Sequence, residues 1–490
     1  MIYWDRIYLV RVTLQEISTQ GAVFAGVRNL WLAGGEKNCN VTQHIGQGTP
    51  RESDEAEFMR CLYTSPYQDR KDRNPNRVPG TCGWFVSHPL FQDWESGKSS
   101  PVLFLSADPG CGKSVLAKHL VEDVLPTTNA RVVCYFFFKD DFEDQQNILS
   151  ALFCMLHQLF KKNRVLFTDA VRDQWLTDGE MLTKSFKGLW KILTEVAQHD
   201  EAGETVCLLD AIDECQQPGR SIFIKELCRL NSTAGGSRLR FIITGRPTDE
   251  IKLAFHPSNY HSVPVINVCG EDAVEVDKIS MEIEMFIRAR VTEIAERRML
   301  TDEERDILLK QVMRVDNRTY LWVHLTLELV ERDIRVNKRQ IIQTTSNLPD
   351  TVDKAYDAIL NTSGQIEEGE KILNIIVAAA RPLSLDELQV AFGAGDQESH
   401  SDLVVDPRDR FRNYIRKISG LILTISDDSN VYLLHQTVKE FLVSRGEGKM
   451  EVNERNGLVW KQRLHSHQSH FILAKACMKY LLSPETQSLL

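Results

Sequence analysis

The 490-residue sequence contains no apolar run of the roughly 18–20 residues that a membrane-spanning helix needs. Its apolar N-terminus is interrupted by Asp5, Arg6 and Arg11, so it also lacks the continuous core of a secretory signal. These absences predict an intracellular, cytoplasmic protein without a transmembrane segment.

An excess of basic residues is also absent. The chain has 58 Lys and Arg against 68 Asp and Glu, a formal net charge of -10. Broad attraction to nucleic-acid phosphates or anionic lipid depends on a concentrated basic surface, which this charge does not favour. We therefore expect no nucleic-acid partner.

Paired cysteine motifs and repeats are missing as well. The 11 cysteines form no CxxC pair and no zinc-like Cys/His spacing, which predicts reduced thiols. The histidines of "HSHQSH" (His465 to His470) have odd spacings and no acidic or cysteine partner, so they predict a polar helix surface. No self-similar period indicates a solenoid or propeller.

What is present is a globular composition, with 42% hydrophobic and 26% charged residues. Four continuous apolar runs alternate with helical patterns, which predicts a parallel sheet covered on both faces. Helices follow, and then more helices with a short hairpin of the winged-helix type. The predicted divisions are 1–80, an N-terminal region and linker; 81–265, a nucleotide-binding domain; 266–347, a small helical domain; 348–445, a winged helix; and 446–490, a C-terminal helical segment. The predicted strands are "VLFL" (102–105), "VVCYFFF" (132–138), "VCLLD" (206–210) and "FIIT" (241–244).

The run "FLSADPGCGKSVLAKHL" (104–120) predicts a strand, a phosphate-binding loop and a helix. Backbone N–H groups and the positive end of the helix dipole attract phosphate there, and the glycines permit close approach. Lys113 is expected to neutralise the β- and γ-phosphates, while the Ser114 hydroxyl ligates Mg²⁺. The predicted phosphate-binding residues are Pro109, Gly110, Cys111, Gly112, Lys113 and Ser114.

One position departs from the usual G-x-x-x-x-G-K-[ST] pattern, because Ala107 stands where the first glycine is expected. If this residue needs a positive φ, alanine costs roughly 1 kcal/mol. A second "GKS" at 97–99 follows no strand and precedes Pro101, so we interpret it as a loop.

Charged residues follow two of the predicted strands. Asp210 ends an apolar strand, at the edge where open α/β sheets bind ligands, and its carboxylate suits Mg²⁺. Asp213 and Glu214 come within one turn and are candidates to orient or deprotonate a water in phosphoryl transfer. Arg246 ends "FIITGR" and is a candidate γ-phosphate contact. The alternatives are a helix-capping role for the acids and a surface position for Arg246.

Together, "SADPGCGKSVLAKHL", "LLDAIDEC", "FIITGRP", "YLWVHLTLELV", "LPDTVDKAYDAIL" and "LLHQTVKEFLV" closely resemble fungal NACHT-type proteins of the STAND class of signal-transduction ATPases. The resemblance runs from about Thr81 to Leu442. It implies an AAA+-like P-loop NTPase sheet followed by an all-helical subdomain and a winged helix.

The resemblance also implies function: a switch that holds ADP when closed, exchanges it for ATP and then self-associates, with slow ATP hydrolysis in nonself-recognition or stress signalling of the innate-immunity or heterokaryon-incompatibility kind. It identifies Lys113 and Ser114 as Walker A residues and Asp210 as the Walker B acid. It further identifies Asp213 and Glu214 as the extended acidic pair, Arg246 as the sensor arginine and His435 as the winged-helix contact to the β-phosphate.

The usual C-terminal sensor repeats are not seen in this sequence, so the sensor and effector partners are unidentified. Two other functions stay open. One is a non-hydrolysing scaffold that holds nucleotide as a structural element. The other is a DNA-associated ATPase, although the candidate recognition helix "SLDELQVAFG" carries Asp386 and Glu387 and no basic residue.

Overall fold

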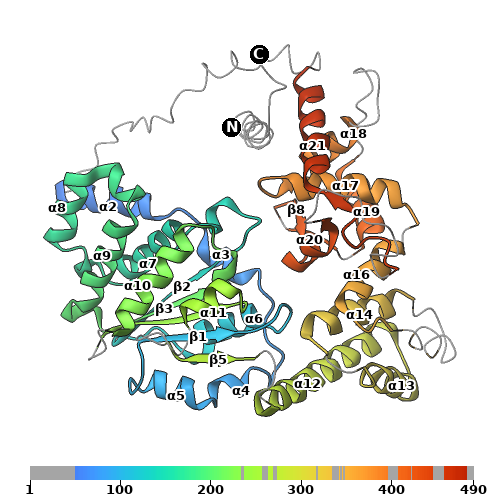
Figure 1. Cartoon of the computed structure of the whole chain (residues 1–490), viewed down its shortest axis with the longest axis horizontal. Coiled ribbons are helices and arrows are strands. Elements are labelled where there is room, and N and C mark those ends of the chain that lie inside the picture. Colours follow the sequence, from blue (N-terminus) through green and yellow to red (C-terminus); the bar gives the residue numbers. More distant parts are fainter. Residues whose placement is uncertain are drawn as a thin grey trace. The chain divides into compact units, whose positions relative to one another are not determined.

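The computed structural model describes the chain in two compact units, the first ending at Asp350 and the second beginning at Thr351 (Figure 1). Each unit is considered by itself. Within the described part of the chain, no helix is both long and apolar enough to cross a membrane. The described residues are 50–232, 237–255, 263–268, 273–315, 318–333, 342, 345, 348–362, 364–394, 407–420, 422–426, 428–444 and 457–482.

The first unit is built on a parallel sheet with the strand order β2-β3-β4-β1-β5. Its inner strands are apolar and buried along their length, as expected for a sheet covered on both faces. The four predicted strands are confirmed; the short fifth strand was not predicted, because three residues give too little pattern. The strands are β1 (Val102–Ser106), β2 (Arg131–Phe137), β3 (Glu204–Asp210), β4 (Leu239–Gly245) and β5 (Val265–Asn267).

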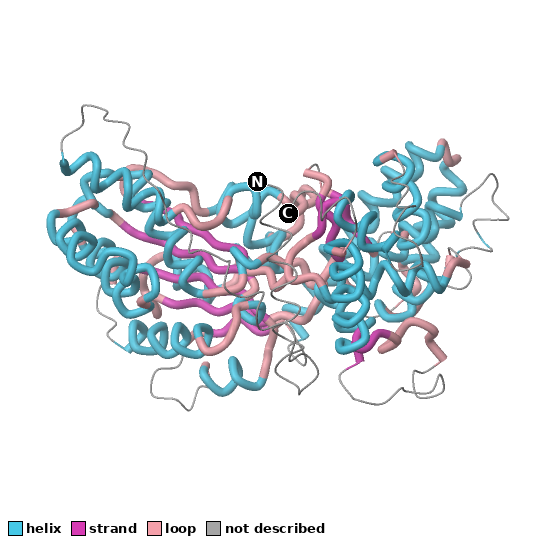
Figure 2. Tube along the Cα trace, turned by 90° about the horizontal axis from the view of Figure 1, so that it is seen from above, coloured by secondary structure: helices cyan, strands magenta, loops and turns pink. Residues whose placement is uncertain are grey.

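Helices lie on both sides of these strands, as Figure 2 shows. Alternate strand residues enter two separate cores: Phe104 belongs to one, while Leu103 and Leu105 belong to the other. The predicted two-sided sheet is therefore confirmed. The covering helices are α4 (Gly83–Val86), α5 (Pro89–Glu95), α6 (Lys113–His119), α7 (Ile148–Lys162), α8 (Asp169–Asp178), α9 (Phe186–Gln198), α10 (Gly219–Ser232) and α11 (Asp249–Ala254).

Residues before the predicted boundary at 80 contribute to this core. Helices α2 (Pro50–Leu62) and α3 (Tyr67–Asp72) bury Phe58, Leu62 and Tyr67, and the Phe58 ring lies 5.0 Å from that of Trp175. Within the predicted N-terminal region and linker, the proline, asparagine and glycine content of residues 65–80 predicts a loop. Residues 67–72 form α3, whereas 65–66 and 73–80 lack a helix; most of the proline, asparagine and glycine residues that break helices lie in 73–80.

Among the described residues, three further helices belong to the first unit: α12 (Ala273–Arg298), α13 (Asp302–Val312) and α14 (Tyr320–Asp333). A capping box at Thr301 and Glu304 starts α13. This segment is helical as predicted, and it shares a compact unit with the sheet. The predicted limits of 266 and 347 stay predictions.

The second unit combines helices with a three-stranded antiparallel sheet in the order β6-β8-β7, which confirms the predicted winged helix. The strands are too short to form a core alone, so the helices supply most of it. The elements are α16 (Val352–Asn361), α17 (Ile366–Ala378), β6 (Leu383–Ser384), α18 (Leu385–Ala394), α19 (Arg408–Ser419), β7 (Leu423–Ile425), β8 (Asn430–Leu433) and α20 (Gln436–Leu442).

The last helix, α21 (Ser466–Leu481), belongs to the same unit. The buried Ser469 hydroxyl donates to Asn374 Oδ1 on α17 over 2.7 Å, and Arg463 pairs with Glu370 over 2.7 Å. A parallel pair of short strands, β9 (Val443–Ser444) and β10 (Leu464–His465), joins this end of the chain to the winged helix. The predicted C-terminal helix is thus packed against the winged helix.

Candidate functional site

The predicted phosphate-binding residues lie between the end of β1 and the first turn of α6. Gly110 and Gly112 have φ values of 78° and 81°, which non-glycine residues rarely adopt. Gly112 is the N-cap of α6, so the loop delivers its backbone to a helix N-terminus. The loop therefore has the backbone of an anion-binding site.

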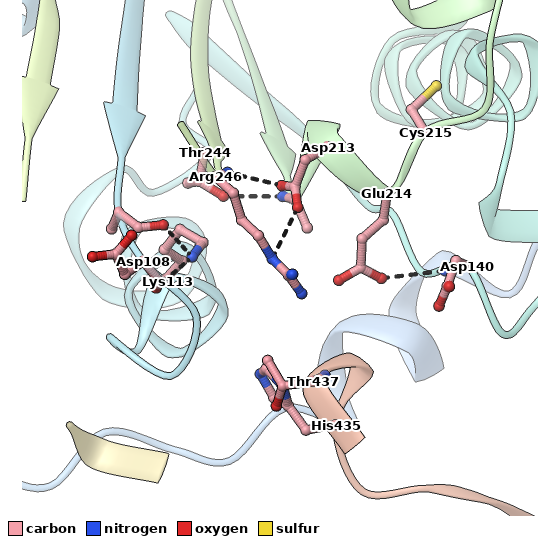
Figure 3. A network of polar contacts seen from close by, with 12 residues as sticks. Asp108, Lys113, Asp140, Asp213, Glu214, Cys215, Thr244, Arg246, His435 and Thr437 are labelled. Carbon is pink, nitrogen blue, oxygen red and sulfur yellow. Dashed lines mark hydrogen bonds and ion pairs between the residues drawn. The ribbon is translucent and has the colours of Figure 1, made fainter. Parts of the chain in front are cut away.

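Lys113 folds back along this loop. Its Nζ donates to the carbonyl oxygens of Ala107 and Asp108 over 2.7 and 2.9 Å, as Figure 3 shows. These bonds hold the ammonium group beside the loop backbone. The structure thus concentrates a positive charge at the loop that the sequence identified.

Ala107 carries no strain. It is buried and is not among the positive-φ residues, and its N–H donates to Gly245 O over 3.1 Å. The cost attached to alanine was conditional on a positive φ, so it does not arise. The second "GKS" follows α5, with Lys98 exposed in a turn, as predicted.

We expect Ala107→Gly to leave ADP affinity unchanged within about twofold, while lowering the free energy of unfolding by about 0.5–1 kcal/mol. Glycine gains more backbone freedom in the unfolded chain, and no φ requirement offsets that gain. Calorimetric titration and urea denaturation measure the two quantities. A tenfold or greater rise in affinity would show that the alanine distorts the loop.

Asp210 ends β3 next to the phosphate loop and is 2% exposed. Burial raises the pKa of its carboxyl, while hydrogen bonds from the Ser114 and Thr244 hydroxyls oppose that rise. The Thr244 bond is 2.6 Å long. The structure therefore brings together Ser114 and Asp210, the two predicted Mg²⁺ ligands, and a hydroxyl and a carboxylate are oxygen donors of the kind that Mg²⁺ prefers.

The chain turns sharply after Asp210. Ala211 has φ 57°, a left-handed conformation that costs a non-glycine residue about 1 kcal/mol or more. A short 3₁₀ turn over Ile212–Glu214 follows. Arg220 fixes this turn from α10 by donating to Asp213 O over 2.6 Å. The sharp turn places the two acids that follow, Asp213 and Glu214, in separate positions.

Asp213 is engaged with the predicted sensor arginine. Its Oδ2 lies 3.1 Å from Arg246 Nε, and its Oδ1 accepts the Arg246 backbone N–H over 3.0 Å. Both carboxylate oxygens are therefore used within the protein (Figure 3). This pairing holds Arg246 at the carboxyl edge of the sheet.

Glu214 has a different environment. Its Oε2 accepts the backbone N–H of Asp140 over 3.2 Å. Burial raises the pKa of Glu214 to about 8; Asp140 and Asp213 add to the rise and Lys139 opposes it. Glu214 is thus able to gain and lose a proton near neutral pH.

Two residues at this edge of the sheet are not among those predicted from the sequence. Thr244 lies on β4 and Asp140 follows β2, and Asp140 Oδ1 is buried without a hydrogen-bond partner among the described residues. Their signal was available, because each ends or follows a predicted parallel strand, where ligands of such sheets bind.

A cavity of about 350 Å³ adjoins α6. It lies between that helix and the segment before α4, with Arg77 and Pro79 on one side and Val115, which follows Ser114, on the other. Its volume is within the range of small-molecule sites. Its lining residues are Asn76, Arg77, Pro79, Val115, Lys118, His119, Glu122 and Asp123.

His435 lies in the second unit as the N-cap of α20. Its Nδ1 accepts the Thr437 backbone N–H over 3.2 Å, and the Thr437 hydroxyl lies 2.8 Å from Tyr356 Oη. Because a backbone N–H only donates, the neutral ring carries its proton on Nε2. The reach of His435 to a phosphate stays a prediction, since each unit is described by itself.

Comparisons with known proteins agree with the motifs. Residues 80–246 match the family "Nephrocystin 3, N-terminal", and residues 356–451 match "GPI inositol-deacylase, winged helix domain". The vegetative incompatibility protein HET-E-1 of Podospora anserina is 26% identical over 379 residues, which are 75% of this chain and 26% of that protein. The chain therefore spans about a quarter of the length of this relative.

Solved structures are more distant. A Walker-type ATPase of Pyrococcus abyssi is 12% identical with a TM-score of 0.36, over 75% of this chain and 97% of that one. A Signal Transduction ATPase with Numerous Domains (STAND) protein with a tetratricopeptide repeat sensor, from Pyrococcus horikoshii, is 12% identical with a TM-score of 0.38, over 85% and 50%. The two family matches, the relative and the ordered motifs agree with the predicted resemblance to fungal NACHT-type P-loop proteins of the STAND class.

Proposed function

We propose that the protein is a nucleotide-dependent switch that binds ADP and ATP with Mg²⁺ and hydrolyses ATP slowly. The observation that carries this proposal is the meeting of Lys113, Ser114 and Asp210 at one edge of the sheet, beside a helix N-terminus. The lysine can bind phosphate, and the hydroxyl and carboxylate can bind a divalent cation. A purely structural loop would need neither a phosphate site nor a cation site.

Each part of the site has a separate role in this proposal. The loop amides and Lys113 bind the phosphates, and Ser114 and Asp210 hold Mg²⁺, which supplies charge neutralisation at the β- and γ-phosphates. Glu214 accepts the proton of the attacking water. Arg246, held by Asp213, stabilises charge on the transferred group.

The cavity beside α6 is where we place the nucleoside. Val115, the residue after Ser114, is one of its lining residues, so the cavity borders the helix that the phosphate loop enters. A volume of about 350 Å³ is enough for a base and ribose. A nucleotide would use both the loop and the cavity, whereas a simple anion would use the loop alone.

Slow turnover follows from the state of Glu214. With a pKa of about 8, this carboxyl holds its proton in most molecules at neutral pH. A protonated carboxyl cannot act as a base, so the raised pKa of Glu214 favours slow hydrolysis. This favours a switch that resets slowly, and it also leaves room for the scaffold alternative in which hydrolysis is negligible.

The DNA-associated alternative has less support. On α18, Glu387 accepts from Arg381 over 2.8 Å, and Asp386 pairs with Arg408. The two acids are thus neutralised within the winged helix, and α18 itself presents no basic residue to a phosphate backbone. Steeply salt-dependent DNA binding in a filter assay would revive this alternative.

The nucleotide that co-purifies with native protein tests the switch directly. We expect bound ADP in a monomeric protein, detected by chromatography of the denatured sample and by light scattering. Protein that carries no nucleotide and binds neither added ADP nor added ATP would refute the proposal.

His435→Ala is expected to speed ADP release by about tenfold and to promote self-association, because one hydrogen bond to a charged phosphate is lost. Fluorescent ADP displacement and light scattering measure these effects. His467→Ala, at an exposed position of the same unit, is the control. An unchanged release rate with a monomeric profile removes His435 from the switch.

A further inference from the structure

The phosphate loop is packed against the start of α14. A Cβ built on Gly112 would lie 3.2 Å from the Tyr320 ring, and one built on Gly110 would lie 2.7 Å from Leu321 Cβ. The Leu321 N–H also donates to Gly110 O over 3.3 Å. The first residues of α14 therefore contact the loop backbone at both of its left-handed glycines.

Glu282 of α12 reaches a second segment, at the start of α4. Its carboxylate accepts the N–H groups of Cys82 and Trp84 over 2.5 and 3.1 Å. This segment follows Arg77 and Pro79, which line the cavity beside α6, and Arg77 donates to Thr81 O over 2.9 Å. Glu282 thus holds the chain on the cavity side.

The same carboxylate also binds Tyr320. Burial raises the pKa of the Tyr320 phenol, and the nearby Glu282 carboxylate and the hydrogen bond to it raise this pKa further. The phenol therefore keeps its proton and donates it to Glu282. The Tyr320 ring also packs edge-on against Phe286 of α12, with centroids 5.3 Å apart. Glu282 is only 7% exposed, and three donors are what a buried carboxylate needs.

One carboxylate is therefore shared between the two segments that border the nucleotide position. On one side it holds Cys82–Trp84 directly. On the other side it holds Tyr320, whose ring rests on Gly112. Neither Glu282 nor Tyr320 lines the cavity.

We propose that Glu282 and Tyr320 are positioning residues that fix the distance between the phosphate loop and the cavity-side segment, so that a nucleoside diphosphate binds across both. This rests on the proposed nucleotide site. A ligand that occupies both segments depends on their separation, whereas inorganic pyrophosphate occupies the loop alone. The two ligands should respond differently to loss of the shared carboxylate.

The test compares Kd values for ADP and for inorganic pyrophosphate, both with Mg²⁺, by calorimetric titration of the full chain. We expect Glu282→Ala to weaken ADP binding by about tenfold and pyrophosphate binding by less than about twofold. Tyr320→Phe, which keeps the ring and removes only the hydroxyl, is expected to give a smaller loss with the same selectivity. Glu296→Ala, at an exposed position of the same helix, is the control.

Conservative replacement separates positioning from folding. Glu282→Gln keeps the size and one acceptor oxygen, so we expect it to recover part of the ADP affinity. If Glu282→Ala and Tyr320→Phe leave ADP binding unchanged, or weaken ADP and pyrophosphate equally, the positioning role is wrong. If wild-type protein fails to bind ADP, or Lys113→Ala binds it as well as wild type, the nucleotide site itself is wrong, whatever these variants do.

Discussion

Lys113→Ala is expected to purify without nucleotide and to bind ADP about a hundredfold more weakly than wild type. The ammonium group is held over the loop by the carbonyl oxygens of Ala107 and Asp108, so it is already in place for phosphate. Charge-assisted hydrogen bonds of this kind contribute about 1.5–3 kcal/mol each, and about 3 kcal/mol corresponds to roughly a hundredfold in Kd. Calorimetric titration and the nucleotide content of the purified protein measure the effect.

The chain offers a matched control, because Lys98 has the same Gly and Ser neighbours in an exposed turn. Lys98→Ala should bind ADP as wild type does. Lys113 belongs to neither of the hydrophobic clusters described on the two faces of the sheet, so the unfolding temperature of Lys113→Ala should change little. Mutant protein that retains stoichiometric ADP would refute the site.

The sheet could be predicted from the sequence because its strands are continuous apolar runs. The runs that became β1 to β4 are buried on both faces, so each shows an unbroken pattern. β5 is only three residues long and includes the exposed Asn267, so its place in the sheet comes from pairing with β1. Pairing between distant segments leaves no local pattern.

The helices before residue 73 were missed for a related reason. α3 is only six residues of mostly charged side chains, and Tyr67 is buried by contacts with β2 and α7 that are distant in sequence. Local composition favours a loop there. Tertiary packing decides the conformation of such short segments.

In the candidate site, too, some features follow from local sequence and others depend on contacts between distant segments. The phosphate loop and Asp210 could be predicted because each lies in one short motif with its own backbone requirement. The partners of Thr244, Asp140 and Glu282 could not be predicted, since each of these residues contacts a strand, turn or helix that is distant in sequence. The sequence also treated Asp213 and Glu214 as one pair, whereas the structure gives them different partners.

Glu214→Gln is expected to lower ATP hydrolysis by about a hundredfold or more while leaving ADP affinity within about threefold of wild type. General bases typically contribute about 10²–10⁴-fold, and the amide keeps the shape and the acceptor for the Asp140 N–H. Single-turnover hydrolysis and calorimetric titration separate the two effects. Equal hydrolysis rates in mutant and wild type would exclude Glu214 as the base.

Comparing Asp213→Asn with Glu214→Gln separates the roles of the two acids. It leaves the Arg246 backbone N–H an acceptor but removes the charge that pairs with its guanidinium. Arg246 would then be less firmly held, so both hydrolysis and the preference for ATP over ADP should fall by several-fold. Loss of hydrolysis with an unchanged nucleotide preference is the pattern expected of Glu214→Gln alone.

The pH dependence gives an independent check on the same carboxyl. Burial raises the pKa of Glu214 to about 8, so the ionised form is a minority below that pH and the majority above it. Hydrolysis should therefore rise about tenfold per pH unit at low pH and level off above about 8, while Glu214→Gln loses this rise.

The stability of the protein should depend on pH in the opposite direction. The folded state binds the proton of Glu214 more tightly than the unfolded chain does, so stability that Glu214 contributes at low pH is lost as the pH rises through about 8. The unfolding temperature of the wild type should therefore fall between about pH 4.5, the ordinary pKa of this carboxyl, and about pH 8, more than that of Glu214→Gln. Parallel curves for the two proteins would contradict the raised pKa.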